Sequence, residues 1–201
     1  TVRAGSAVTM PQLAMEAARR GFGGLEWAAG VPGTVGGAVA MNAGAFGQDT
    51  SSSLKGLVCH TDEDGPRERD AEEFQFGYRE WELRDRALVL EAEFRLVSLP
   101  GKQAREETVE LLQDRHNSQP VGERSAGCMF KNPPGESAGA LIDRAGLKGS
   151  REGPVVVSSQ HANYFVNEGD ATYTQVRTLI DRVRERVLKE FNVELPLEIQ
   201  V

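Results

Sequence analysis

The chain has 201 residues, of which 39% are hydrophobic and 26% are charged, as in ordinary globular proteins. This length suits one large domain or two small ones. The net charge of -7 argues against a broad basic face that binds nucleic acid, so an anionic ligand would need locally placed Lys or Arg side chains.

The N-terminal part is predicted to contain a strand, a helix and a glycine-rich segment. Val2 to Gly5 reads as the end of a strand, and a helix runs from Thr9, which fits a capping box with Gln12, to Gly21. The uncharged run from Trp27 to Gly47 is long enough to raise the question of a membrane span. Its six glycines, Pro32 and Asn42 would make a poor spanning helix, so we expect a buried loop and no membrane partner.

Two strands are predicted in the middle of the chain. Residues 54–60 read as a strand that is followed by a turn at 62–65. Residues 88–97 alternate between apolar and charged side chains, which predicts a half-buried strand. The side chains expected to face one way are Leu88, Leu90, Ala92, Phe94 and Leu96.

Helices and strands are mixed in the C-terminal half. In chain order we expect a helix at 105–116, a helix at 137–145, strands at 155–158 and 164–166, a helix at 172–190 and a strand at 193–201. Val109 and Leu112 are the expected buried residues of the first helix. The last helix has the clearest apolar stripe, formed by Val176, Leu179, Ile180, Val183 and Val187. Because these elements lack a strict βαβ rhythm, the predicted class is α+β.

The two cysteines, Cys59 and Cys128, lie far apart in sequence and lack the spacing of metal ligands. We expect no metal site, and reduced thiols in a cytoplasmic protein.

The densest glycine cluster runs from Gly30 to Ala38 and continues from Met41 to Gly47. Glycines expose backbone N–H groups and remove Cβ atoms, which suits a phosphate or a flat ring. The spacing matches neither a dinucleotide fingerprint nor a Walker loop. A purely structural turn remains the alternative.

Three further side chains could carry chemistry. Arg79, beside an aromatic residue in Phe76-Gly77-Tyr78-Arg79, could hold a carboxylate, although most such Arg residues are surface residues. Cys128 could be a nucleophile, a proton donor or an inert core thiol, with His161 as a spatial partner. Glu198 would point away from the core in a strand, where a solvated carboxylate is the plain interpretation.

Eight ordered segments resemble the UDP-N-acetylenolpyruvoylglucosamine reductase family, also called the UDP-N-acetylmuramate dehydrogenases. The matching segments cover nearly the whole chain, which makes them far more specific together than any one alone. They are Gly30 to Ala38, Met41 to Gly47, Phe76 to Arg79, Gln119-Pro120, Ser125 to Pro133, Gly139 to Gly149, His161 to Asn167 and Leu195 to Ile199.

The resemblance implies an FAD-binding lobe of the UDP-N-acetylmuramate dehydrogenase/vanillyl-alcohol oxidase type and a C-terminal α+β substrate-binding lobe. We expect the first at 1–118 and the second at 119–201, with the last strand able to pack back towards the flavin lobe. It also implies a monomer that uses FAD and NADPH to reduce UDP-N-acetylglucosamine enolpyruvate to UDP-N-acetylmuramate for peptidoglycan. Hydride goes to the enolpyruvyl methylene carbon, and a proton donor then quenches the enol.

Roles follow by motif position. Cys128 matches the proton donor, and Arg79 and Glu198 match the pair that polarises the substrate carboxylate and stabilises the enol. The residues implied to contact the substrate are Tyr78, Arg115, Gln119, Lys131 and Asn132. Those implied to line the flavin are Gly30, Val31, Pro32, Gly33, Thr34, Val35, Gly36, Gly37, Ala38, Asn42 and Gly44.

The chain departs from the family pattern in three places. A further N-terminal lobe of the family is missing, which predicts weak FAD binding by this chain. The stretch between Arg79 and Leu88 is too short for the tyrosine-bearing insertion of some members, so the chain resembles the shorter, second type. Gln200 stands where many members have Arg.

Two other functions compete with the reductase. One is a flavin oxidase or dehydrogenase of the same fold, acting on a hydroxyl group or a hydroxy acid, where the Cys128 and Glu198 motifs would have no role. The other is a non-catalytic fragment that binds flavin or a nucleotide sugar.

Overall fold

The computed structural model describes residues 1–63, 65–83 and 86–200. The chain divides into two units, Thr1–Asp114 and Arg115–Val201. Each unit has its own hydrophobic core. Within the described ranges, no helix is long and apolar enough to cross a membrane.

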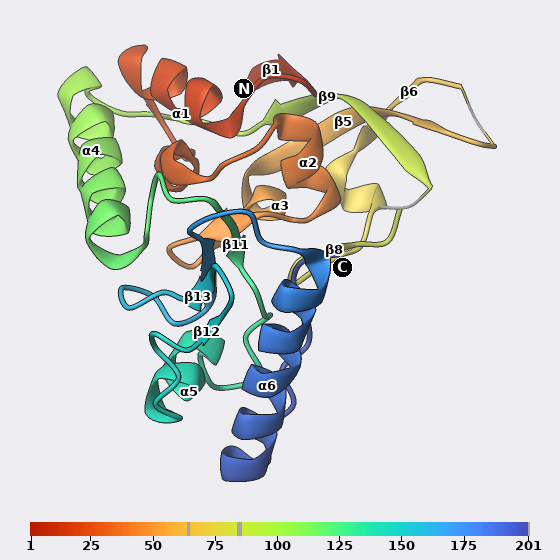
Figure 1. Ribbon diagram of the computed structural model, residues 1–201. Coiled ribbons are helices and arrows are strands. Elements are labelled where there is room, and N and C mark those ends of the chain that lie inside the picture. The colour runs from red at the N-terminus through yellow and green to blue at the C-terminus, as the bar shows by residue number, and fades with distance from the viewer. Residues whose placement is uncertain (64, 84–85, 201) are drawn as a thin grey trace. The chain divides into compact units, whose positions relative to one another are not determined.

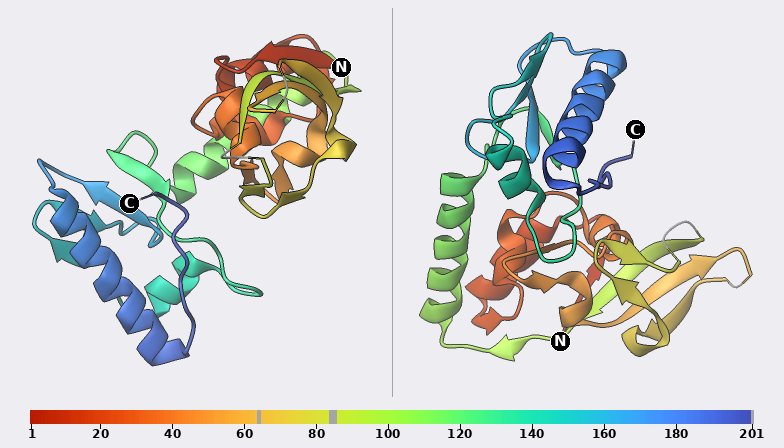
Figure 2. Two further views of the ribbon diagram at one scale, coloured as in Figure 1. Left: turned by 90° about the vertical axis from the view of Figure 1, so that its right-hand side faces the viewer. Right: turned by 90° about the horizontal axis from the view of Figure 1, so that it is seen from below.

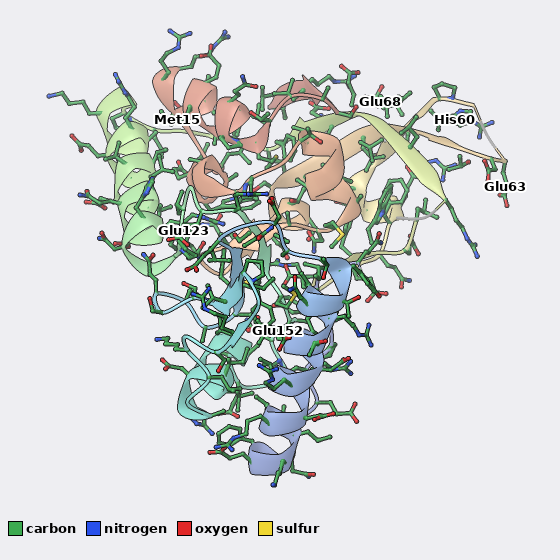
Figure 3. The ribbon with its side chains drawn as sticks, viewed as in Figure 1. Met15, His60, Glu63, Glu68, Glu123 and Glu152 are labelled. Carbon is green, nitrogen blue, oxygen red and sulfur yellow. The ribbon has the colours of Figure 1, made fainter. Side chains whose placement is uncertain are left out.

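Unit 1 is built on an antiparallel sheet of four strands in the order β1-β9-β5-β6. The strands are β1 (Val2–Gly5), β5 (Leu54–Thr61), β6 (Arg67–Asp70) and β9 (Ala87–Phe94). Arg3 pairs with Glu68 on β6 (labelled in Figure 3) and with Glu93, which also binds Lys55 at 3.1 Å. These ion pairs mark a polar face of the sheet.

Two helices accompany this sheet. In α1 (Met10–Arg19), Thr9 is the N-cap and both halves of the predicted capping box with Gln12 are present. The expected buried loop is partly wrong, because Thr34 caps a short helix, α2 (Val35–Ala40). Figure 1 shows α2 beside β9, with which it makes contact. Val35, Ala38 and Val39 face the core, and this stripe explains why a glycine-rich run becomes helical.

Short elements complete unit 1. They are β2 (Phe22–Gly23), η1 (Glu26–Gly30), β3 (Gly44–Ala45), β4 (Gln48–Asp49), α3 (Thr50–Ser53), η2 (Ala71–Glu73), β7 (Phe76–Gly77), β8 (Glu80–Trp81) and β10 (Val97–Ser98). The predicted turn at 62–65 includes Asp64, which lies outside the described residues.

The predicted alternation of residues 88–97 is wrong at its start. Leu88 is 63% exposed, whereas its neighbour Val89 is buried. The cause is a β-bulge: Val58 pairs with Glu91 but Cys59 pairs with Val89, so Leu90 is an extra residue on β9. Because of this extra residue, the side chains before it point to the opposite face of the sheet from the one predicted. Ala92 and Phe94, after the bulge, face inward as expected.

The helix predicted at 105–116 is longer than expected. It spans α4 (Gly101–Ser118) and begins directly after Pro100. Val109, predicted to be buried, is 54% exposed. Ala104 and Thr108 are buried instead, while Leu112, also predicted to face inward, is partly buried against the core together with Leu111. Thr108 follows Ala104 by four residues, and Leu111 and Leu112 follow Thr108 by three and four, so these residues share one helix face. Val109 lies outside it.

Unit 2 has a second antiparallel sheet, in the order β11-β14-β13-β12. The strands are β11 (Ser125–Cys128), β12 (Arg151–Glu152), β13 (Val155–Val157) and β14 (Tyr164–Asn167). The two predicted helices are confirmed as α5 (Ala138–Arg144), capped by Ser137, and α6 (Tyr173–Phe191), capped by Thr172. Figure 2 shows α6 alongside this sheet, where it contacts β12 and β13.

The predicted strand at 193–201 is wrong as a regular strand. Residues 193–200 form no regular strand: they make one isolated bridge, from Leu197 to Phe130, and bend at residues 198–199. Pro196 has no N–H group, so it can only accept, and its carbonyl binds the Lys131 N–H at 2.8 Å. Val201 lies outside the described residues. The predicted α+β class is confirmed by two antiparallel sheets that each pack with helices.

Candidate active site

In unit 1, the glycine-rich segment presents mostly backbone at its surface. Pro32, Gly33 and Gly37 are exposed, whereas Val31 and Val35 are buried. The segment is fixed from behind, because the N–H groups of Val35 and Gly36 donate to the carbonyls of Val8 and Ser6. A Cβ on Gly36 would lie 3.0 Å from the Cβ of Ser6, so this close approach favours glycine.

The second glycine-rich stretch forms the hairpin β3–β4. Its two turn residues, Phe46 and Gly47, both have positive φ, at 54° and 75°. Gly44 has no room for a side chain, since a Cβ would lie 2.4 Å from the carbonyl oxygen of Gln48. This hairpin therefore has a conformation that its sequence specifies tightly.

Arg79 lies in a second hairpin, β7–β8, in which Phe76 pairs with Trp81 and Gly77 with Glu80. Its φ of 56° is in the left-handed region. The guanidinium group donates to the carbonyl of Gly44 at 2.8 Å and lies 5.1 Å from the ring centre of Tyr78. Tyr78 is half exposed. Backbone carbonyls and an aromatic ring thus orient this cation.

In unit 2, a bulge sets the orientation of Cys128. Ser125 pairs with Val166 and Cys128 with Tyr164, so β11 carries one residue more than β14 across this interval. Gly127 within the bulge has φ of 82°. Bulges of this kind re-aim the side chains beside them.

Asn163 holds the segment that follows Cys128. Its Oδ1 accepts from the Phe130 N–H at 3.0 Å, and its Nδ2 donates to the Phe130 carbonyl at 2.8 Å. Asn163 and Phe130 are both buried. One amide side chain therefore satisfies both backbone groups of Phe130.

The structure brings the backbone of Glu198 to the same segment. Its N–H donates to the carbonyl of Met129 at 3.0 Å, next to Cys128. Two candidate residues that are distant in sequence thus lie on adjacent segments of one unit. Arg79 belongs to the other unit.

Sequence reasoning missed Tyr164, whose hydroxyl donates to Gln119 Oε1 at 2.8 Å. Cys128 and Arg115 lie close enough to this hydroxyl to influence its pKa. The edge of its ring meets His161, with 4.9 Å between the ring centres. The signal that could have identified it was the matched segment from His161 to Asn167.

The other candidates of unit 2 lie on the segment after Cys128 and at the end of α4. Lys131 follows the Phe130 bridge, and its backbone pairs with Pro196. Asn132 Oδ1 accepts from the N–H of Ala138 at 3.0 Å, which fixes the start of α5. Arg115 and Gln119 lie where α4 ends and the loop begins.

Burial shifts the pKa values of Tyr164, His161 and Cys59. It raises the pKa of Tyr164 to about 12, with the neighbouring Cys128 as the next cause, so the phenol stays neutral over the physiological range. It lowers the pKa of His161, whose Nδ1 accepts from the Asn163 N–H. Burial also raises the pKa of Cys59, which lies in the core of unit 1 and is not a candidate.

The residues of unit 1 fit a bound flavin. The surface from Gly30 to Gly37 offers backbone and a proline ring, and no atom lies within 4 Å of where a Gly33 Cβ would be. A flat ring or a phosphate can approach such a surface closely. Within the described ranges no group of His, Cys, Asp and Glu could hold a metal ion.

Two protein-family models match the chain. A FAD binding domain matches residues 1–66, and the C-terminal domain of UDP-N-acetylenolpyruvoylglucosamine reductase matches residues 119–201.

Curated relatives match along the whole chain. UDP-N-acetylenolpyruvoylglucosamine reductase 2 of Symbiobacterium thermophilum is 43% identical, with 100% of this chain and 66% of the relative covered. The UDP-N-acetylenolpyruvoylglucosamine reductase of Wolbachia pipientis is 39% identical, and 100% and 69% are covered. The chain thus spans about two thirds of the length of these relatives.

A solved structure agrees with both findings. The crystal structure of UDP-N-acetylenolpyruvylglucosamine reductase from Thermus caldophilus matches with a TM-score of 0.89 and 38% identity, over 100% of this chain and 72% of that one. The predicted resemblance and its FAD-binding fold are confirmed. The chain belongs to the UDP-N-acetylenolpyruvoylglucosamine reductase family.

Proposed function

We propose that the protein reduces UDP-N-acetylglucosamine enolpyruvate to UDP-N-acetylmuramate, with FAD bound and NADPH as the reductant. The observation that carries this proposal is the pairing of the Glu198 backbone with Met129, beside Cys128. Family membership supplies the substrate class.

The proposed lobes are residues 1–118 for the flavin and 119–201 for the substrate. The glycine-rich surface from Gly30 to Ala38, with Gly44, would hold FAD, which supplies the hydride once NADPH has reduced it. Lys131, Arg115, Gln119 and Asn132 would bind the nucleotide sugar, whose diphosphate needs local donors on an acidic protein.

The chain's own side chains handle the carboxylate and the proton. Arg79 and Tyr78 would hold the enolpyruvyl carboxylate, and Glu198 would hydrogen-bond the enol. Cys128 gives its proton to the carboxylate-bearing carbon: the S–H bond breaks, a C–H bond forms and the enol collapses to the acid. Solvent then reprotonates the thiolate.

We further propose that the protein acts as a monomer in the cytoplasm, in the peptidoglycan synthesis that supports cell shape and division. The two free cysteines fit a reducing compartment.

Steady-state NADPH oxidation tests the proposal. We expect oxidation that depends on the enolpyruvyl nucleotide and yields one UDP-N-acetylmuramate per NADPH. Bound flavin without this dependence would favour the non-catalytic fragment. Flavin reduction by a hydroxy acid would favour the oxidase or dehydrogenase.

A further inference from the structure

Two segments of unit 1 that lie 35 residues apart in sequence hold each other by reciprocal hydrogen bonds. The Asn42 side chain donates to the Gly77 carbonyl at 2.9 Å, which fixes the hairpin β7–β8. In the other direction, Arg79 on that hairpin donates to the carbonyl of Gly44 at 2.8 Å. We call these two contacts the hairpin latch.

The Asn42 side chain directs its hydrogen bonds into the protein. Its Nδ2 donates to Gly77 and, at 3.3 Å, to Asp49 Oδ2, which uses both of its hydrogens. Its Oδ1 accepts from the Ser51 N–H at 2.9 Å. Only 2% of Asn42 is exposed. The amide is therefore engaged with protein groups on every polar atom.

The backbone is in an uncommon conformation at both ends of the latch. Asn42 has φ of 40° and Arg79 has φ of 56°, and each such residue costs of order 1 kcal/mol unless its surroundings enforce it. The Asn42 side chain bonds supply that enforcement for the first residue. For the second, the Gly77 contact anchors the strand directly before the turn.

We propose that Asn42 is a positioning residue for Arg79, which it orients by fixing the β7–β8 hairpin. This inference rests on the proposed function, in which Arg79 binds the substrate carboxylate. It assigns Asn42 a role in the substrate half-reaction, whereas the family resemblance groups Asn42 with the flavin-lining residues.

Asn42→Asp tests this role with little change of shape. Asp keeps an oxygen for the Ser51 N–H and tolerates the left-handed region, but it cannot donate to Gly77, and it faces the Asp49 carboxylate. We expect turnover of the enolpyruvyl nucleotide to fall about 10²-fold, as for a small misplacement of a catalytic group. FAD affinity and flavin reduction by NADPH should stay within about twofold of the parent.

Three measurements separate positioning from a general structural effect. Backbone amide exchange should accelerate in residues 77–82 of Asn42→Asp. In an Arg79→Ala background, Asn42→Asp should cause no further loss of turnover, since residues that act as one unit are non-additive. UDP-N-acetylglucosamine, which lacks the carboxylate, should bind the parent and Asn42→Asp equally.

The matched control is Asn192→Asp, because Asn192, the C-cap of α6, is also an Asn in the left-handed region, with φ of 56°. It should cost stability, and its turnover should match the parent. Weaker FAD binding by Asn42→Asp with unchanged hairpin exchange would overturn the proposal and make Asn42 a cofactor contact. Full additivity with Arg79→Ala would also overturn it. A parent without substrate-dependent NADPH oxidation would refute the proposed function instead, and the exchange measurement would still decide whether the latch holds.

Discussion

Asn163→Ala removes the side chain that holds Phe130, and its cost can be worked out from the two contacts. The substitution leaves the buried N–H and carbonyl of Phe130 without the bonds of 3.0 and 2.8 Å. A buried backbone group without a partner costs about 1–3 kcal/mol, so the pair costs about 2–6 kcal/mol. At about 3 kcal/mol, the Tm of a domain of this size falls by about 12–24 °C.

Thermal and urea unfolding, followed by circular dichroism and calorimetry, measure this loss. The control is Asn167→Ala, since Asn167 is only partly buried and its side chain accepts one turn bond, from the Gly169 N–H at 3.1 Å. We expect the control to lose less than about 1 kcal/mol. An equally small loss of unfolding free energy in the two variants would show that the two Asn163 hydrogen bonds to Phe130 do not stabilise unit 2.

Three further outcomes are expected. Cys128→Ala should lower turnover about 10²–10⁴-fold while Cys128→Ser keeps substantial activity, and stopped-flow absorbance should show normal flavin reduction in both. Tyr164→Phe, which loses the bond to Gln119 and the hydroxyl near Cys128, should lower turnover about tenfold in the parent and have no effect in Cys128→Ala, as steady-state rates of the double variant would show. Because burial lowers the pKa of His161 below 6.5, the unfolded state binds the extra proton and stability should fall as the pH drops below about 6.5; urea titrations of His161→Gln should lack this slope.

Local signals in the sequence predicted helices α1, α5 and α6 well. Thr9, Ser137 and Thr172 each accept from a backbone N–H of the first turn, and the predicted apolar stripe of α6 is buried except for a partly exposed Val176. Capping and periodicity depend on neighbours within a few residues, so one sequence contains all the information they need.

Errors occurred where a distant partner decided the outcome. The bulge at Leu90 depends on pairing with β5, and the bridge at Leu197 depends on Phe130. Neither pairing can be seen in the local alternation of apolar and polar residues. The inward face of α4 was missed because a small residue, Ala104, and a polar one, Thr108, form part of it.

In the candidate site, too, features that depend on local sequence were predictable, and contacts between distant residues were not. The glycine-rich surface was a candidate from its residue types, since close approach needs glycine, whereas Cys128 became the candidate proton donor only through the family resemblance. The contact of Tyr164 with Gln119 spans 45 residues and that of Asn42 with Gly77 spans 35. Only folding brings such pairs together, and their roles stay predictions until the variants above are measured.

The measurement that tests the central claim most directly is a single-turnover reaction. The protein is loaded with FAD, reduced anaerobically with one equivalent of NADPH and mixed with UDP-N-acetylglucosamine enolpyruvate. We predict rapid return of the oxidised flavin absorbance and formation of one equivalent of UDP-N-acetylmuramate. Flavin that stays reduced in the presence of this nucleotide would contradict the proposed function.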